Sequence, residues 1–415
     1  MGHCFAGQRP SHNVLWSQYG LISMPFRIPS PQVLKFFLAQ RVAAWMGRRR
    51  RMDAGLGDPA LSPSARHFAD YETAPLKLRF VAQQQVDAKK WQALARAKLA
   101  ELCGYAPSTG VPEALRDDVF ALANGMSRRR IYLKPRPGVV IPIHLVERSG
   151  RPRPSSVMIC LQGTNSGAHL SWGEVRFAAD IEKRSDGYDF AIQAAERGYL
   201  AVAIEQSCFG ERTERMISPR SAAPCVDATM HALLLGRSLL GERCSDVSAV
   251  IDWLTASAAD LAVDAGEIHA MGHSSGGSIA LFTGALDERI GAVLACGCIG
   301  FIRETIGRRR DDQGQNVVPG MLQWMELADV VGLLAPRPLV TVAGTDDHIW
   351  PAKGAIAVIQ EAKNIYAKLD ANDLIACVSE PGGHRFRPAA SWSSFQAVLE
   401  RKPRAGTPPA LLRDP

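Results

Sequence analysis

Gly272-His273-Ser274-Ser275-Gly276 is the stretch of sequence that decides the fold. An apolar, β-branched run (residues 267–271) precedes it, and an alanine-rich run suited to a helix (residues 277–286) follows it. A strand, G-x-S-x-G and a helix in this order predict a sharp, strained turn that holds the hydroxyl of Ser274 exposed. The two glycines let the backbone pass close to its neighbours at this turn. The stretch therefore predicts a strand–turn–helix unit that presents Ser274 as a nucleophile.

Short, continuous apolar runs alternate with helix-like segments after Pro154. This alternation is typical of a parallel sheet covered by helices on both faces, so an α/β fold with a mostly parallel, doubly wound sheet is expected. Two further strand candidates (130–133 and 139–146) flank a Pro-Gly turn, and helices are expected over 84–103 and 230–256. The apolar runs are 157–161, 199–204, 268–272, 292–298, 339–342 and 374–378.

The charge distribution sets the first residues apart from the rest of the chain. Residues 1–60 hold eight basic and two acidic side chains, so most of the net charge of +7 belongs to this segment. The nearly neutral remainder does not look like a nucleic-acid-binding surface. We expect a basic N-terminal extension over 1–60, an α/β catalytic domain over 61–400 with a candidate cap at 301–334, and a C-terminal tail over 401–415.

One helix is expected within the extension, over Val33–Met46. Its aromatic residues and the following cluster of arginines would suit a membrane surface, so residues 31–51 are a candidate for peripheral membrane contact. The less specific interpretation is a helix docked on the catalytic domain or on a partner subunit, and a homo-oligomer stays open. No run approaches the roughly 18 apolar residues of a transmembrane helix, and the first residues do not resemble a secretory signal. A cytoplasmic location is therefore expected.

The nine cysteines show no metal-binding spacing, and no C-x-x-C occurs. Such cysteines are expected to be small buried thiols in a reducing compartment. Cys208 and Cys225 flank a loop and would be the pair to form a disulfide if the protein were exported.

A nucleophilic serine needs a base that accepts its proton and a carboxylate that orients the base. The strand candidate after residue 337 runs into Gly344-Thr345-Asp346-Asp347-His348. Two aspartates compete there, and the spacing Gly-x-x-Asp-x-x-x-Pro favours Asp347 over Asp346. Asp347 is therefore expected to orient the base.

The base is expected after the last strand candidate. Residues 374–378 open into a loop softened by glycines, which contains His384. His348 is the nearby rival, but it precedes this strand. Ser274, Asp347 and His384 thus follow one another at successive strand ends, as a catalytic triad would.

The tetrahedral intermediate of acyl transfer also needs N–H donors aimed at its oxyanion. The N–H of Ser275, directly after the nucleophile, is one expected donor. The second donor is expected in the loop after residues 157–161, which reads Gln162-Gly163-Thr164-Asn165. Thr164 is favoured, with Gly163 next.

Taken together, these residues resemble the α/β-hydrolase superfamily, and within it the dienelactone-hydrolase-like and acetyl-xylan-esterase-like branch. The resemblance implies an α/β-hydrolase fold and a serine hydrolase that needs no metal or organic cofactor. Dienelactone hydrolases use a cysteine nucleophile, and glucuronoyl esterases carry Arg after the serine, where this chain has Ser275. The stretches that carry the resemblance are 161–163, 196–199 with 208–212, 272–277 and 335–339.

The expected function is hydrolysis of a small-molecule carboxylic ester, such as an acetylated or other short-acyl molecule or sugar, through an acyl-enzyme. The alternatives are an amidase or peptidase of the prolyl-oligopeptidase-like type and a membrane-peripheral lipase. A non-catalytic binding protein is disfavoured because all three triad positions are intact. Trp350 and Trp172 lie near the acid and the oxyanion loop in sequence and either line the substrate site or simply pack. Glu205 lies beyond a strand end and is a third candidate for substrate binding.

Overall fold

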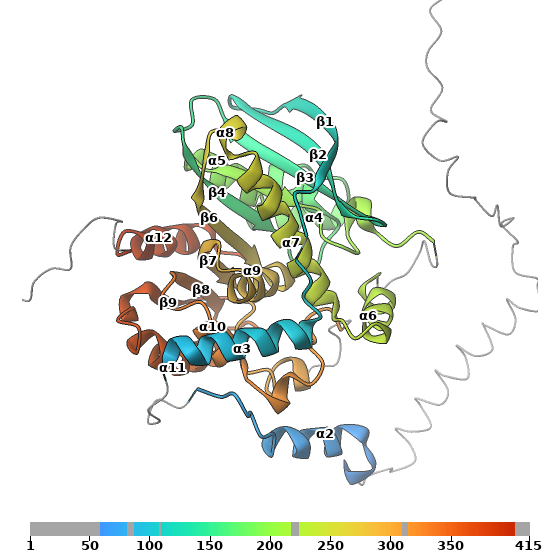
Figure 1. Cartoon of the computed structure of the whole chain (residues 1–415), viewed down its shortest axis with the longest axis vertical. Helices are drawn as coiled ribbons and strands as arrows, with labels where there is room; N and C mark the ends of the chain where they lie inside the picture. Colours follow the sequence, from blue (N-terminus) through green and yellow to red (C-terminus); the bar gives the residue numbers. More distant parts are fainter. Residues whose placement is uncertain (1–58, 81–86, 108, 217–223, 309–313, 403–415) are drawn as a thin grey trace, which may run out of the picture. The chain divides into compact units, whose positions relative to one another are not determined.

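The computed structural model describes residues 59–80, 87–107, 109–216, 224–308 and 314–402 (Figure 1). The chain divides into two units, residues 1–65 and 66–415. The described part of the first unit holds η1 (Pro59–Leu61) and the beginning of α2 (Pro63–Glu72). The helix expected over 33–46, the candidate membrane segment 31–51 and nearly all of the tail over 401–415 lie outside the described residues.

Nine strands of the second unit form one sheet in the described residues, in the order β1-β2-β3-β5-β4-β6-β7-β8-β9. β1, β2 and β3 form an antiparallel meander, and β3 also pairs antiparallel with β5. From β5 to β9 all pairs are parallel, which confirms the predicted mostly parallel sheet of an α/β fold. The strands are β1 (Glu113–Ala121), β2 (Met126–Arg136), β3 (Val139–Arg148), β4 (Ser155–Leu161), β5 (Leu200–Ile204), β6 (Val263–His273), β7 (Ile290–Cys296), β8 (Leu339–Gly344) and β9 (Ile375–Glu380).

Helices cover both faces of this sheet (Figure 1). Successive side chains of a strand point to opposite faces, and in β4 Val157 and Ile159 join one buried cluster whereas Met158 and Cys160 join another. The first cluster packs against α3 (Ala88–Cys103), α7 (Leu239–Ala256), α9 (Ser275–Leu286), α10 (Leu327–Gly332) and α11 (Ala352–Ala367). The second packs against α5 (Phe190–Glu196) and α12 (Pro388–Leu399).

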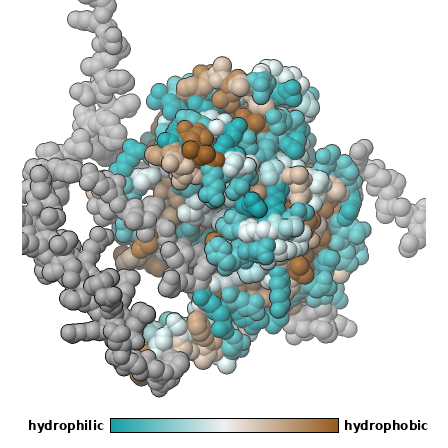
Figure 2. All heavy atoms as spheres, turned by 180° about the vertical axis from the view of Figure 1, so that it is seen from behind, coloured by the Kyte–Doolittle hydropathy of each residue, from teal (hydrophilic) through white to brown (hydrophobic). Residues whose placement is uncertain are grey.

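The outer surface is mainly hydrophilic on the side shown in Figure 2, with small, separated apolar patches. Within the described ranges, no helix combines the length and the apolar character needed to cross a membrane. Shorter helices complete the fold: α4 (Ala178–Ser185), α6 (Pro224–Leu234) and α8 (Ala258–Leu261).

The expected single helix over 230–256 is wrong, because the chain breaks it in two. α6 ends at Leu234, Gly236 adopts a left-handed φ of 69°, and Ser238 caps α7 by accepting a hydrogen bond from the N–H of Gly241. A glycine in this conformation stops a helix, and a serine at the N-cap starts the next one. The strand expected over 292–298 lies two residues earlier, at Ile290–Cys296, because Gly297 has a φ of 57° and ends it.

The turn between β6 and α9 depends on close backbone contacts that only glycine allows. A Cβ atom at Gly276 would lie 2.1 Å from the carbonyl oxygen of Leu161 and 2.5 Å from that of Gln162. A Cβ atom at Gly272 would lie 2.4 Å from the carbonyl carbon and oxygen of Gly276. The start of α9 is therefore pressed directly against the end of β4.

Replacing Gly276 by alanine should lower the free energy of unfolding by about 3 kcal/mol or more, because the new methyl group overlaps backbone that cannot move aside. Alanine would otherwise favour a helix by about 1 kcal/mol, so the expected sign is opposite to that of helix propensity. Urea denaturation followed by circular dichroism measures the change. Gly110→Ala is the control, because a Cβ atom at Gly110 would have no other atom within 4 Å. Equal stability of the two variants would contradict the packing argument.

Candidate active site

Three loops at the carboxyl end of the parallel strands bring Ser274, His384 and Asp347 together. Ser274 follows β6, Asp347 follows β8 and His384 follows β9. The Nε2 atom of His384 lies 2.9 Å from Oγ of Ser274, and its Nδ1 atom lies 2.7 Å from Oδ2 of Asp347. This is the hydrogen-bond order of a serine–histidine–carboxylate relay.

Asp347 is fixed by the loop that carries it. Its Oδ1 atom accepts hydrogen bonds from the N–H groups of Ile349 at 2.8 Å and Trp350 at 2.9 Å. Burial by itself would raise the pKa of this carboxyl group, but the bonds from His384 and from the two N–H groups bring the pKa below its usual value. Asp346, its rival in the sequence, faces elsewhere and accepts from the N–H of Gly382 at 3.1 Å.

Ser274 has the strained backbone expected of an exposed nucleophile on a tight turn. Its φ is 58° and its ψ is −127°, a conformation that side chains rarely adopt. The N–H of Ser274 donates to the carbonyl of Cys296 at 2.9 Å, which ties the turn to the end of β7.

A second histidine packs against the triad. The ring of His273 is buried, and its centroid lies 4.7 Å from that of His384. Its Nδ1 atom lies 2.9 Å from the hydroxyl of Tyr188. Burial, and then the charge of His384, hold the pKa of His273 well below its usual value, so this ring is neutral. It is a packing surface for His384 rather than a second base.

The residues predicted for the oxyanion hole lie beside the nucleophile. A Cβ atom at Gly163 would lie 3.2 Å from Cβ of Ser274, so the loop after β4 touches the turn. Within the described residues, the N–H groups of Gly163 and Thr164 donate no hydrogen bond. The N–H of Ser275 belongs to the first turn of α9, where such groups have no partner inside the helix. All three N–H groups are therefore available to an oxyanion.

Two polar residues that the sequence analysis missed connect these positions. Gln315, from the candidate cap, donates through Nε2 to Oγ1 of Thr164 at 2.9 Å and accepts through Oε1 from Oγ of Ser275 at 3.1 Å. Arg243, on α7, donates to both Ser275 Oγ at 3.3 Å and Gln315 Oε1 at 3.1 Å. Arg243 lies on the same face of α7 as Leu239 and Val247. A charged residue at such a position is the signal by which the sequence could have indicated it. Gln315 lies in irregular structure and leaves no comparable signal.

The two tryptophans proposed for substrate binding have packing roles in the structure. Trp350 is only 2% exposed, and its N–H holds Asp347. Trp172 is buried in the cluster behind β4, with the guanidinium of Arg128 4.6 Å from its ring centroid and its Nε1 donating to Glu174.

Glu205, the third residue predicted to bind substrate, instead holds the backbone that follows the predicted oxyanion loop. It is buried, and its carboxylate accepts hydrogen bonds from the N–H groups of Ala168 at 2.9 Å and Glu211 at 3.3 Å. Burial raises its pKa to about 7, against the opposing effect of these two bonds. The side chain thus holds the backbone that follows Thr164.

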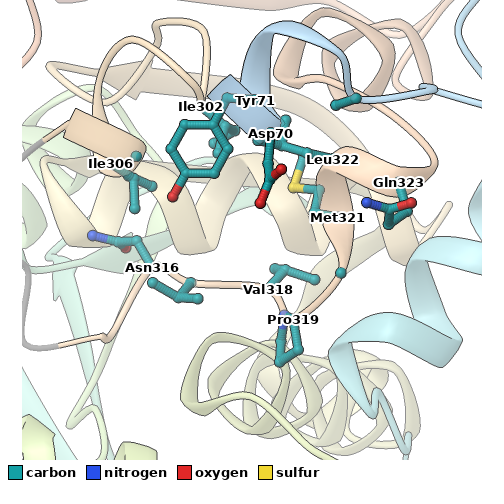
Figure 3. Close-up of a pocket in the computed structure, with 14 residues that line it drawn as sticks. Asp70, Tyr71, Ile302, Ile306, Asn316, Val318, Pro319, Met321, Leu322 and Gln323 are labelled. Carbon is teal, nitrogen blue, oxygen red and sulfur yellow. The ribbon is translucent and has the colours of Figure 1, made fainter. Parts of the chain in front are cut away.

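A pocket of about 340 Å³ lies beside the cap segment (Figure 3). Its walls come from α2, including Asp70 and Tyr71, and from two stretches of the cap, 302–307 and 316–323. The triad residues do not line it. Asn316 in its wall directly follows Gln315, so the same cap stretch shapes this pocket and reaches the oxyanion loop.

None of the eight cysteines in the described ranges forms a disulfide, including Cys208 and Cys225. These two belong to one small buried cluster, and their thiols are in hydrogen-bond contact. The hydrogen bond with Cys225, followed by the charge of Arg243, lowers the pKa of Cys208 to about 6. In the same ranges, no group of three or more His, Cys, Asp or Glu side chains is arranged to hold a metal ion.

Comparison with known proteins shows which family and which relatives this chain matches. The profile of the Abhydrolase family matches residues 72–368. The "Putative hydrolase YtaP" of Bacillus subtilis (strain 168) is 27% identical over 197 residues, which is 47% of this chain. The chain spans 62% of the length of that relative.

Solved structures share the fold at low sequence identity. A "putative acetyl xylan esterase" from Bacteroides fragilis has a TM-score of 0.61 and 17% identity, over 81% of this chain and 89% of that protein. A glucuronoyl esterase from Solibacter usitatus has a TM-score of 0.53 and 15% identity, over 79% of this chain and 95% of that protein. These likenesses confirm the expected α/β-hydrolase fold.

Replacing Glu205 by glutamine should flatten the pH dependence of stability. The pKa of Glu205 is higher in the folded state than in the unfolded state, so its contribution to the free energy of unfolding is complete below pH 4.5. This contribution is lost as the pH rises through about 7. The loss is about 3 kcal/mol at most for a shift of this size. We expect urea denaturation to show a smaller fall in unfolding free energy from pH 5 to pH 8 in Glu205→Gln than in the wild type. Parallel pH profiles would contradict this assignment.

Proposed function

The chain belongs to the Abhydrolase family, and from this membership we propose that it is a serine hydrolase that cleaves a carboxylic ester through an acyl-enzyme. The observation that carries the proposal is the continuous relay from Oγ of Ser274 through His384 to Asp347, with distances of 2.9 and 2.7 Å. A partly buried serine on a strained turn, a base and a buried carboxylate supply the parts that nucleophilic acyl transfer requires.

Acylation begins when Oγ of Ser274 attacks the ester carbonyl carbon while Nε2 of His384 takes the hydroxyl proton. The carbonyl oxygen becomes an oxyanion, which accepts hydrogen bonds from the N–H groups of Ser275 and of Thr164 or Gly163. The intermediate then collapses. The bond to the alcohol breaks, and His384 returns the proton to the leaving oxygen.

Deacylation repeats this sequence with water as the nucleophile. His384 takes a proton from water, the hydroxide attacks the acyl carbon, and Oγ of Ser274 leaves and recovers the proton. Asp347 holds Nδ1 of His384 throughout and stabilises the imidazolium that forms twice in each cycle. Its own N–H partners keep it ionised and oriented.

We place the substrate among small esters with a short acyl group, including acetylated sugars. Two structures with this fold are named as esterases, one as a "putative acetyl xylan esterase" and one as a glucuronoyl esterase. The cap stretch that holds Gln315 against Thr164 would border the bound ester, because it contacts the oxyanion loop directly.

Replacing Ser274 by alanine should abolish ester hydrolysis. We expect kcat/KM for p-nitrophenyl esters, from acetate to octanoate, to fall by about 10⁴-fold or more, because the nucleophile is lost. The wild-type chain-length optimum would size the acyl site. Ser278→Ala is the control, since Ser278 lies one helical turn further along α9, and it should keep its rate. Faster turnover of the matching p-nitroanilides would favour an amidase, whereas an inert wild type would exclude the proposed function.

Replacing Asp347 by asparagine should lower kcat by about 10⁴-fold with little change in KM, because the amide cannot hold His384 in the required tautomer. Asp346→Asn is a matched control one residue away, and it should stay within about threefold of the wild type. Steady-state kinetics on p-nitrophenyl acetate measure both. The opposite ranking of the two variants would assign the acid to Asp346.

A further inference from the structure

Arg243 is a buried cation close behind the oxyanion loop. Its residue is 1% exposed, and it lies in α7, which packs against α9. Its guanidinium donates to the carbonyl of Ser207 at 2.7 Å and to Sγ of Cys225 at 3.3 Å, in addition to Ser275 and Gln315. Every one of these partners is an uncharged oxygen or a thiol.

The guanidinium of Arg243 is therefore buried without a carboxylate partner. Among the described residues no Asp or Glu lies within ion-pair distance of Arg243, whereas Arg212 pairs with Asp246 at 2.8 Å and Arg289 with Asp287 at 2.7 Å. Burying a cation without a counter-ion is costly. A guanidinium without a carboxylate partner can stabilise a negative charge that forms nearby.

The position of the charge is the second argument. Arg243 contacts Ser275, which begins α9, and the N-terminus of a helix already carries partial positive charge. A cation at this end makes the folded state less stable. Arg337 shows the favourable arrangement, because it donates to the carbonyls of Gly284 at 2.7 Å and Asp287 at 3.2 Å at the other end of the same helix.

The hydrogen bonds carry the third argument. Arg243 binds Ser275 and Gln315, and Gln315 binds Thr164. Ser275 and Thr164 are the two residues whose N–H groups are proposed to hold the oxyanion, and they follow different strands, β6 and β4. Arg243 and Gln315 thus link the two proposed sides of the oxyanion hole through side-chain hydrogen bonds.

We infer that Arg243 is a positioning residue that makes the oxyanion hole more positive and fixes the spacing of its two donors. The inference rests on the proposed function, because it concerns the charge that forms during ester cleavage. In the transition state the carbonyl oxygen becomes negative, and a fixed cation in a water-poor site then acts strongly. The neutral ester gains much less, so the effect belongs to kcat rather than to KM.

The alternative role for Arg243 is as the counter-ion of a thiolate. The lowered pKa of Cys208 shows that the charge of Arg243 is felt by its neighbours, after the larger effect of the hydrogen bond from Cys225. If pairing with this thiol were the whole function, Cys208→Ser would change the kinetics as much as the loss of Arg243. We expect Cys208→Ser to keep kcat within about threefold.

The test compares Arg243→Gln and Arg243→Lys on p-nitrophenyl acetate. We expect the glutamine variant to lose roughly 10- to 100-fold in kcat with KM changed less than about threefold. The lysine variant, which keeps the charge, should recover at least about fivefold. Phenylboronic acid, which forms a tetrahedral anion on serine, should bind the glutamine variant more weakly by a similar factor to the loss in kcat.

Arg337→Gln is the control, because Arg337 is a half-buried arginine at the other end of α9 that donates only to backbone carbonyls. It should lower the melting temperature and leave kcat of the folded protein unchanged. The inference is overturned if Arg243→Gln keeps the wild-type kcat, if lysine gives no recovery, or if boronate affinity is unchanged. A wild type without Ser274-dependent esterase activity would instead remove the proposed function, so the two failures are distinguishable.

Discussion

The lack of a side chain at Gly276 is the constraint on which the rest of the site depends. The carbonyl oxygens at the end of β4 occupy the space that any Cβ atom would need, at 2.1 and 2.5 Å. This contact fixes the start of α9 against the loop that begins at Gln162. The nucleophile and the oxyanion loop belong to strands β6 and β4, which are neighbours in the sheet. The distance between Ser274 and the loop after β4 is thus set by contacts between backbone atoms, which changes of side-chain rotamer do not alter.

The remaining parts of the relay are fixed in a different way, by hydrogen bonds within short loops. Asp347 accepts from the N–H groups of Ile349 and Trp350, and His384 lies between this carboxylate and Ser274. The neutral ring of His273 fills the space beside His384. Because parallel strands end at the same edge of the sheet, residues more than a hundred positions apart meet with little loop between them.

The turn, the order of the triad and the parallel sheet were predictable because each leaves a local pattern: glycine spacing, strand ends and continuous apolar runs. The break at Gly236 was missed because apolar residues lie on both sides of the short segment Gly236-Arg237-Ser238. The sequence left open whether Trp172 and Trp350 line the substrate site or pack, and both are buried in the structure, while Glu205 holds a loop. Arg243 and Gln315 were not found, since their contacts join α7, the cap and β4, and no local spacing encodes a contact between distant segments.

Helix α9 has an arginine near each end. One of them stabilises the folded state, and the other destabilises it. Arg337 donates to carbonyl groups at the C-terminal end of the helix, whereas Arg243 donates to Oγ of Ser275 at the N-terminal end, where the helix dipole is positive and disfavours a cation. A laboratory selection for heat resistance alone would therefore favour neutral residues at 243 and keep the arginine at 337. The proteins that such a selection yields would refold well and turn over slowly. Directed evolution of this protein should consequently select for catalytic turnover as well as for stability from the first round. Position 243 should not be varied in a library designed for stability.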